Sequence, residues 1–461
     1  MTAHMDRFAA AVEHHLGQKA VVTQPERLER LAVDESGEGP YPPLAAIYPT
    51  TPDQARACLA LASEFRVPVT PRGAGTGKSG GALAVQGGVI LGTERMARIL
   101  DIDEADMVAV VEPGVITSVL QEEVESRGLF YPPDPSSLES CTIGGNLAEN
   151  AGGPRAMKYG VTRRFILGAE VSLMDGTKME LGGRNLKDVS GYDLTSLMVG
   201  SEGTLALATR LQLRLLARPR TVGAVWASFP TFEAAGRAVS ALLRSGLDLR
   251  CLELIDHASL TYGVLETSGL AAQGKAALLA EMDGWEEDMT PRLAEAGQVC
   301  EREGAVDVNL ALDAASLRRL WSGRRHLSDA LKKSHPHKLS EDVTVPVGRV
   351  GQMMSEAWAI GTRHDIEVAV YGHAGDGNLH VNFLPHSAGE RQTVEQTAAA
   401  ELIKTALDLG GTLSGEHGVG LTKRAWMVLR HGPEELSMMR RIKASWDPVG
   451  LLNPGKLLPS P

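Results

Sequence analysis

Short apolar runs and helical spacings alternate along the first part of the chain. Residues 45–48 and 67–70 are apolar runs of the length of buried strands, and residues 53–65 between them have the spacing of an amphipathic helix. Residues 5–34 predict short helices, and residues 37–43, rich in glycine and proline, predict a loop before the first strand. The pattern therefore predicts a β-α-β unit that leads into a glycine-rich loop.

The same alternation continues and divides the chain into two predicted domains. We predict an α+β fold with a helical segment at 1–40, a first domain at 41–219 and a second domain at 220–461, where a new alternation begins after Pro219. Further strands of the first domain are expected at 89–91, 107–111, 166–173 and 205–213. In the second domain we expect strands at 221–228 and 250–255, a hairpin at 366–384 and helices at 232–245, 314–333 and 392–409.

Length, charge and cysteine content narrow the functional class. The 461 residues exceed the roughly 250–300 that a single hydrophobic core organises, which agrees with two domains. The net charge of −11 argues against nucleic acid as a partner. The four cysteines form no CxxC pair, so neither a disulfide framework nor an iron–sulfur cradle is expected.

No stretch has the ~18 apolar residues of a membrane span, and the N-terminus shows no secretory or transit pattern. We therefore expect a cytoplasmic protein that would meet a membrane only through a partner.

Residues 71–81, PRGAGTGKSGG, form a glycine-rich loop after a predicted strand. Such a loop exposes backbone N–H groups that can converge on a phosphate. Gly77-Lys78-Ser79 matches the end of a nucleotide-hydrolysing P-loop, but Arg72 stands where that motif requires its first glycine. A Rossmann loop would open an amphipathic helix, which is not predicted here. The third alternative is a turn that binds no ligand. It is disfavoured because ordering so many glycines costs conformational entropy, and only a close backbone approach would require glycine at these positions.

This loop and four later segments resemble, in order, the FAD-binding domain of the vanillyl-alcohol-oxidase (p-cresol-methylhydroxylase) family. The later segments are 112–115 (EPGV), 133–137 (PDPSS), 142–153 (TIGGNLAENAGG) and 200–204 (GSEGT). The resemblance implies a two-domain flavoprotein, and because the loop contains no histidine, it implies noncovalent FAD. The residues implied to bind FAD are Arg72, Gly73, Ala74, Gly75, Thr76, Gly77, Ser79, Gly80, Asp134, Pro135, Ser136, Thr142, Gly144, Gly145, Asn146, Asn150, Gly152, Gly153, Glu202, Gly203 and Asn453.

A second group of motifs lies near the C-terminus. His373 and His380 flank AGDGN, whose turn chemistry predicts a hairpin, and strand alternation places His380 and Asn382 on one face and returns His380 towards His373. Glu416 and His417 lie in the glycine-lined loop GGTLSGEHGVG. Two histidines and a carboxylate are a recurrent ligand set for Zn²⁺, Mn²⁺ or Fe²⁺, although each histidine alone would more often be a structural residue.

GHAGDGNLHVN and GEHGVG resemble the ferredoxin-like C-terminal domain of FAD-linked oxidases that act on D-lactate, glycolate and D-2-hydroxyglutarate. The resemblance implies that His373, His380 and Glu416 bind a divalent metal, with zinc as first choice and manganese as second. The segment 451–456 (LLNPGK) resembles the closing segment of that family, which returns to the flavin domain.

The same resemblance implies the reaction. Arg324, in WSGRR, would bind the substrate carboxylate, although a solvated helix charge is the alternative for this residue. Asn382 would contact the substrate, and His417 would take the proton of the C2 hydroxyl while the hydride moves to FAD. The electron acceptor stays open among a quinone, a cytochrome, an electron-transfer flavoprotein, an iron–sulfur subunit and oxygen, and a homodimer is compatible with the sequence. An FAD oxidoreductase for another alcohol and a non-catalytic nucleotide-binding module are the alternatives.

One departure from the family pattern bears on the substrate. Relatives that oxidise D-2-hydroxyglutarate carry a lysine shortly before a strand that ends in proline, and alignment on Pro346 puts Ser340 at that position. A serine hydroxyl cannot neutralise a second carboxylate, so we predict a small D-2-hydroxy acid such as D-lactate or glycolate. Lys338, two residues earlier, could reach the same place if the backbone bulges, which keeps D-2-hydroxyglutarate as the alternative.

Overall fold

The structure is a computed structural model that describes residues 2–264 and 273–460, and it divides into two compact units. Unit 1 comprises residues 1–152, 160–218 and 416–461, whereas unit 2 comprises residues 153–159 and 219–415. The expected α+β fold is confirmed, since each unit mixes helices with sheets. Among the described residues, no helix is long and apolar enough to cross a membrane.

Unit 1 opens with a four-stranded sheet that leads into the glycine-rich loop. Its order is β1-β2-β4-β3, in which β2, β4 and β3 run parallel and β1 is antiparallel to β2. Apolar side chains of α1 and α3, such as Phe8 and Leu59, pack against this sheet, and Thr51 caps α3 by accepting from the Gln54 N–H at 3.2 Å. The elements are α1 (Thr2–Leu16), η1 (Gln18–Ala20), β1 (Val21–Val22), α2 (Pro25–Glu29), β2 (Ala45–Ile47), α3 (Pro52–Glu64), β3 (Val69–Arg72) and β4 (Val89–Gly92).

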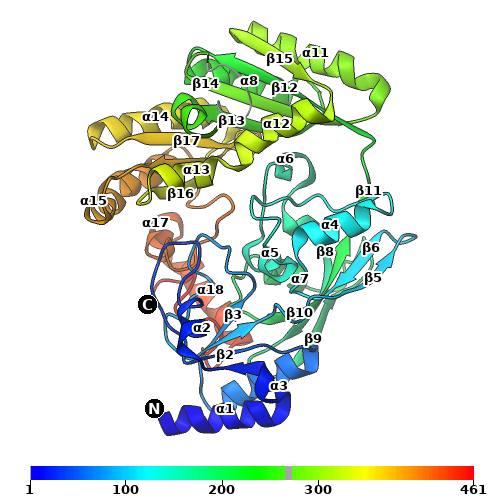
Figure 1. Cartoon of the computed structure of the whole chain (residues 1–461), viewed down its shortest axis with the longest axis vertical. Coiled ribbons are helices and arrows are strands. Elements are labelled where there is room, and N and C mark those ends of the chain that lie inside the picture. The colour runs from blue at the N-terminus through cyan, green and yellow to red at the C-terminus, as the bar shows by residue number, and fades with distance from the viewer. Residues whose placement is uncertain (1, 265–272, 461) are drawn as a thin grey trace. The chain divides into compact units, whose positions relative to one another are not determined.

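A five-stranded antiparallel sheet of order β5-β6-β10-β8-β9 completes unit 1, together with a short β7-β11 pair (Figure 1). The edge strands β5 and β9 are absent from the sequence-based expectation, because no residue of β5 and only one residue of β9 is buried, so neither strand forms an apolar run. The elements are β5 (Ile99–Asp103), β6 (Val108–Val111), α4 (Thr117–Glu125), β7 (Leu129–Phe130), α5 (Ile143–Glu149), η2 (Thr162–Phe165), β8 (Ile166–Ser172), β9 (Lys178–Gly182), α7 (Leu194–Met198), β10 (Leu207–Arg214), β11 (Leu216–Ala217), η6 (Arg424–Trp426), α17 (Met427–Arg430) and α18 (Pro433–Trp446).

The end of the chain returns to the parallel sheet of unit 1. The Val69 N–H donates to the Leu451 carbonyl at 2.8 Å, and the Asn453 N–H donates to the Val69 carbonyl at 2.7 Å. Lys443, on α18, donates to the Leu452 carbonyl at 2.8 Å. The closing residues therefore lie beside β3, the strand that precedes the glycine-rich loop.

Unit 2 is built on a seven-stranded antiparallel sheet of order β15-β12-β14-β13-β17-β18-β16. Its first four strands in sequence, β12 to β15, alternate with α8 and α11 and stand in the order fourth, first, third, second, which is the ferredoxin-like arrangement. The strands are β12 (Thr221–Phe229), β13 (Leu249–Asp256), β14 (Ala276–Gly284), β15 (Asp307–Ala311), β16 (Leu339–Thr344), β17 (Val368–His373) and β18 (Asn378–Phe383).

Helices cover both faces of this sheet (Figure 1). Apolar residues of α8, α11, α14 and α16 form the large core on one face, and Leu320, Leu327 and Leu331 of α12 and α13 pack on the other. The helix expected at 314–333 is two helices, because the backbone turns at His326. The helices are α6 (Ala156–Tyr159), α8 (Phe232–Arg244), α9 (His257–Ser259), η3 (Leu260–Val264), α11 (Glu286–Arg302), α12 (Ala314–Arg325), α13 (Leu327–Ser334), η4 (Val347–Arg349), α14 (Val350–Arg363), α15 (Ala388–Val394), η5 (Glu395–Ala399) and α16 (Ala400–Asp408).

Candidate active site

The backbone of the glycine-rich loop of unit 1 passes close to the Thr142 side chain. A side chain at Gly73 would collide with the Thr142 hydroxyl, which caps α5 by accepting from the Gly145 N–H at 3.2 Å. Gly75 and Gly80 have backbone φ angles of 75° and 78°, which residues other than glycine rarely adopt. The loop thus lies against the start of the 142–153 motif, and its backbone is suited to face an anion closely.

Several residues expected to bind FAD are engaged within unit 1 itself. The Arg72 guanidinium donates to the carbonyls of Val33 and Ala82 at 3.0 and 3.2 Å, so its charge holds the N-terminal segment in place. The Asn146 amide donates to the Thr117 hydroxyl at 2.8 Å. For these two residues the observed side-chain contacts are structural ones.

Asn453 and Glu202 connect the loops that carry the flavin motifs. The Asn453 side chain donates to the Gly81 carbonyl at 3.0 Å and to the Glu202 carbonyl at 2.8 Å. The Glu202 carboxylate in turn accepts from the N–H groups of Val419 and Gly420 at 2.8 and 2.6 Å. The glycine-rich loop, the 200–204 turn and the closing segment are therefore one hydrogen-bonded assembly.

The remaining expected flavin residues also belong to unit 1, apart from Gly153, which is the first residue of a segment assigned to unit 2. Asp134 and Pro135 are buried, whereas Ser136 is exposed. Asn150 ends α5 in the left-handed conformation, with φ of 54°, and its side-chain oxygen accepts from the Arg163 N–H at 2.9 Å.

Glu149, at the end of α5, was not among the residues predicted to bind FAD. Its Oε1 would lie 3.1 Å from a side chain at Gly81, and its buried Oε2 has no hydrogen-bond partner among the described residues. Burial and the nearby Glu202 carboxylate raise the pKa of Glu149 well above its ordinary value, while Lys456 opposes the shift. Burial also lowers the pKa of Lys456 to about 8. When protonated, the Glu149 carboxyl is a hydrogen-bond donor close to Gly81 of the glycine-rich loop, which would suit a diphosphate ligand.

The expected hairpin of unit 2 is confirmed and carries the two histidines. In the β17–β18 register His373 pairs with Asn378 and Tyr371 pairs with His380, so these side chains lie on one sheet face. The rings of His373 and His380 lie 5.3 Å apart and perpendicular to each other. Strand alternation sends Leu379, Val381 and Phe383 into the core on the opposite face.

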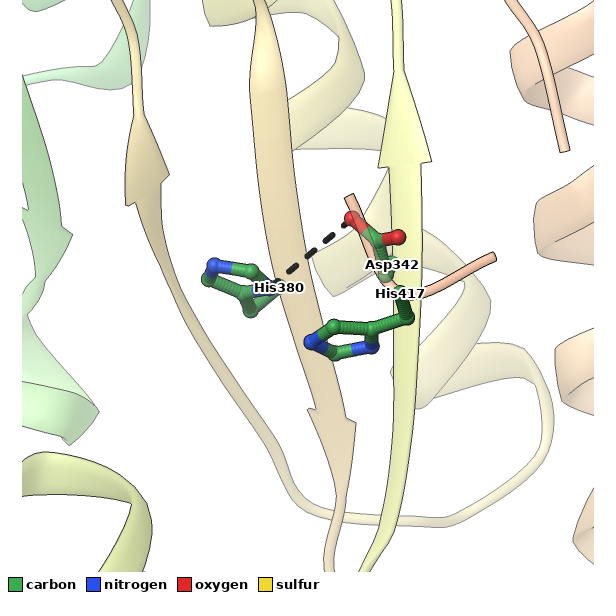
Figure 2. Close-up of side chains that lie close together, drawn as sticks. All are labelled: Asp342, His380 and His417. Atoms are coloured by element: carbon green, nitrogen blue, oxygen red, sulfur yellow. Dashed lines mark ion pairs between the residues drawn. The ribbon is translucent and has the colours of Figure 1, made fainter. Parts of the chain in front are cut away.

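Asp342, on the neighbouring strand β16, lies opposite His380 (Figure 2). One of its carboxylate oxygens is 4.0 Å from His380 Nδ1, and the other accepts from the Ser414 hydroxyl at 2.7 Å and the Gly415 N–H at 3.0 Å. Asp342 is fully buried, and sequence reasoning passed over it. It therefore anchors the chain immediately before Glu416.

Arg324 is 7% exposed, which excludes the alternative of a solvated helix charge. Its Nε donates to Glu253 Oε2 at 2.6 Å, and its guanidinium lies over the Tyr371 ring at 4.7 Å. Glu253 Oε1 lies 2.6 Å from His373 Nδ1. Burial opposes ionisation of Glu253, but Arg324 and His373 outweigh it and hold the pKa of Glu253 below its ordinary value. The only sequence signal for Glu253 is a carboxylate within the otherwise apolar CLELI stretch of a strand.

Lys338 and Ser340 flank the predicted substrate contact Asn382. Ser340 pairs with Asn382 across β16 and β18, and Lys338 Nζ lies 3.5 Å from Asn382 Oδ1. Lys338 reaches Asn382 without a backbone bulge, because residues 338 and 340 lie on the same face by ordinary alternation. Its ammonium also donates to the Ser328 carbonyl and hydroxyl, both at 2.9 Å.

The predicted site residues divide between the two units. Arg324, His373, His380 and Asn382 belong to unit 2, and their side chains gather at one face of its sheet. Glu416 and His417 are the first residues after Gly415 that belong to unit 1. Within that unit a side chain at Gly152 would lie 3.2 Å from Glu416 Oε2.

Two family models match the chain. The FAD binding domain matches residues 43–182, and the C-terminal domain of FAD linked oxidases matches residues 218–457. Among curated proteins, the chain is 40% identical to glycolate oxidase subunit GlcD of Bacillus subtilis over 90% of this chain and 89% of that protein. It is 35% identical to D-lactate dehydrogenase of Archaeoglobus fulgidus (89% and 90%) and 32% identical to D-2-hydroxyglutarate dehydrogenase of Stutzerimonas stutzeri (95% and 96%).

Solved structures show the same fold at low identity. The fold matches p-cresol methylhydroxylase with a TM-score of 0.82 at 17% identity, over 99% of this chain and 97% of that one. It matches 4-ethylphenol oxidase from Gulosibacter chungangensis with a TM-score of 0.80 at 18% identity, over the same shares. Both domain matches and the relatives above 30% identity agree, so this chain belongs to the FAD-linked oxidases, a family of flavin-dependent oxidoreductases.

Proposed function

We propose that this enzyme oxidises a small D-2-hydroxy acid, glycolate or D-lactate, to the corresponding 2-oxo acid. One arrangement carries the proposal: the buried Arg324 guanidinium is held at the sheet face that also bears His373, His380 and Asn382. A buried cation beside imidazole and amide groups suits a small anion that must also lose a proton. The 40% identity to a glycolate oxidase subunit supports the same substrate class.

Three side chains of the chain have separate roles in the proposed reaction. Arg324 binds the substrate carboxylate, Asn382 contacts the substrate, and His417 accepts the proton of the C2 hydroxyl. Unit 1 would hold FAD noncovalently, and the flavin would supply the acceptor for the hydride from C2. Two electrons and one proton thus leave with the hydride, the second proton goes to His417, and the product is the 2-oxo acid.

A divalent metal held by His373, His380 and Glu416 is part of the proposal, with zinc as first choice and manganese as second. His373 suits this role because Glu253 engages its Nδ1, which directs Nε2 to a ligand. The metal would polarise the C2 hydroxyl and lower its pKa. Metal analysis of the purified protein and of His380→Ala tests the assignment, since a variant that keeps both metal and full activity would refute it.

A second candidate substrate is the dicarboxylate D-2-hydroxyglutarate. The observation in its favour is the Lys338 ammonium at 3.5 Å from Asn382, where it could meet a second carboxylate. The 32% identity to a D-2-hydroxyglutarate dehydrogenase supports the same reading. We place it second because Lys338 already donates to both oxygens of Ser328.

Anaerobic mixing with a panel of D- and L-2-hydroxy acids tests the proposed function. We expect the flavin to bleach with glycolate and D-lactate, and the electrons to pass afterwards to a separate acceptor, such as a quinone, a cytochrome, an electron-transfer flavoprotein or an iron–sulfur subunit. The name "subunit" of the glycolate oxidase relative supports a separate protein in this role. A flavin that no 2-hydroxy acid bleaches would refute the proposal and favour another alcohol or a non-catalytic module.

A further inference from the structure

Glu253 is a fully buried carboxylate that contacts two side chains of the proposed site. It lies on β13 directly opposite His373 on β17. Its Oε1 is 2.6 Å from His373 Nδ1, and its Oε2 accepts from Arg324 Nε at 2.6 Å. One carboxylate therefore joins a proposed metal ligand to the proposed substrate anchor.

The contact with His373 decides which ring nitrogen carries the proton. A carboxylate paired with a guanidinium only accepts hydrogen bonds, so His373 Nδ1 must be the donor. In the neutral ring the lone pair then resides on Nε2. Such outer carboxylates fix the ring orientation of metal-binding histidines and make the coordinating nitrogen more basic.

The contact with Arg324 decides which edge of the guanidinium remains for a ligand. Nε and Nη2 both lie 2.6 Å from Glu253 Oε2, and the Tyr371 ring covers one face of the group at 4.7 Å. The edge formed by the two terminal nitrogens is left to meet a carboxylate end-on. Without Glu253 the guanidinium could turn about its side chain and lose this orientation.

We propose that Glu253 is a positioning residue that orients the substrate anchor Arg324 and the coordinating nitrogen of His373 together. The inference rests on the proposed function, because it assigns Glu253 a role in that same site. It predicts that substrate binding and metal binding weaken together when this one buried carboxylate is changed. A carboxylate that only stabilised unit 2 would instead lower the stability of the fold and leave both affinities unchanged in the folded protein.

The test compares Glu253→Gln with Asp256→Asn. Asp256 is a matched control, because it is fully buried on the same strand but accepts from Ser259, Val370 and Trp358. For Glu253→Gln we expect zinc affinity to fall roughly 10- to 100-fold and KM for D-lactate or glycolate to rise, with FAD content near that of the wild type. Thermal melting should also fall, because the buried Arg324 guanidinium loses its counterion, so both affinities are measured on the folded fraction. Asp256→Asn is expected to keep the zinc affinity and KM of the wild type.

Zinc titration and steady-state kinetics of the folded holoenzyme give the decisive readouts. Excess zinc should restore part of the turnover of Glu253→Gln but not its KM, because the orientation of Arg324 does not depend on metal. If Glu253→Gln does not fold, Glu253→Asp keeps the charge but is too short to reach both partners, and it should lose one of the two affinities. If the Glu253 variants kept the zinc affinity and KM of the wild type, or if Asp256→Asn lost as much of both affinities as Glu253→Gln, the inference would be overturned. The proposed function would then still stand. A wild type that binds no metal and is not reduced by any 2-hydroxy acid would overturn the proposed function and this inference with it.

Discussion

Ser340→Lys should extend the substrate range of this enzyme towards a dicarboxylate. Ser340 is half-buried on β16 and pairs directly with Asn382, the proposed substrate contact. Its hydroxyl is too short and carries no charge to neutralise a distal carboxylate. A lysine at this position would share the sheet face with Asn382 and would place an ammonium close to this proposed substrate contact.

The magnitude follows from the cost of leaving a carboxylate without a cation in a partly desolvated pocket. That cost is about 1–3 kcal/mol, so kcat/KM for D-2-hydroxyglutarate should rise roughly 5- to 150-fold in Ser340→Lys. D-Lactate has no second carboxylate, and its kcat/KM should stay level or fall. In the wild type, Lys338 is committed to Ser328 at 2.9 Å, so we expect it to supply little of this stabilisation.

Anaerobic flavin reduction measured by stopped flow with D-lactate, glycolate and D-2-hydroxyglutarate gives the comparison. Ser340→Met is the matched control, since it adds a side chain of similar length without the charge. Equal rates for Ser340→Lys and Ser340→Met with the dicarboxylate would refute the reasoning. A wild type that already prefers D-2-hydroxyglutarate, and loses that preference in Lys338→Ala, would show that Lys338 serves the distal carboxylate.

Three further predictions concern the flavin and the base. Acid precipitation should release FAD into the supernatant, because no histidine lies in the glycine-rich loop; yellow colour that stays with the pellet would contradict noncovalent binding. His417→Ala should keep its FAD and lose ~10²–10⁴ in turnover, the usual size of a general-base contribution, and unchanged turnover would place the base elsewhere. FAD affinity of the apoprotein should fall as pH rises, because the raised pKa of Glu149 keeps its carboxyl neutral at lower pH and its ionisation then places a negative charge near the diphosphate loop. Fluorescence titration of FAD between about pH 6 and 9 should show this dependence in the wild type and not in Glu149→Gln, and identical pH profiles of the two would exclude Glu149 as the cause.

Periodicity predicted the local geometry of the hairpin site correctly. Alternation along 378–383 placed His380 and Asn382 on one face and three apolar side chains on the other, and the structure has this arrangement. The prediction succeeded because side-chain direction in a strand has a period of two and the Asp-Gly turn sets the register. The order of the motifs likewise identified the family, which the domain matches confirm.

The pattern of apolar and polar residues was less informative at the exposed edge strands of a sheet and at a break within a predicted helix. The strands β5 and β9 were missed because edge strands need not be apolar. The break at His326 was missed because no proline marks it and the nearby Gly323 lies within α12. The side-chain roles of Arg72 and Asn146 could not be read either, since each donates to groups that lie well apart along the chain.

The amino-acid sequence by itself determined which side chains could do chemistry and which of them lie on one face of a strand. Tertiary structure decided their partners. Glu253 reaches His373 across a separation of 120 residues, because β13 and β17 are neighbours in the sheet although β14, β15 and β16 separate them in the chain. It reaches Arg324 across 71 residues, because α12 packs on the same face of that sheet. Local periodicity carries no information about such pairing, since the order of strands depends on which arrangement buries the whole apolar surface of unit 2.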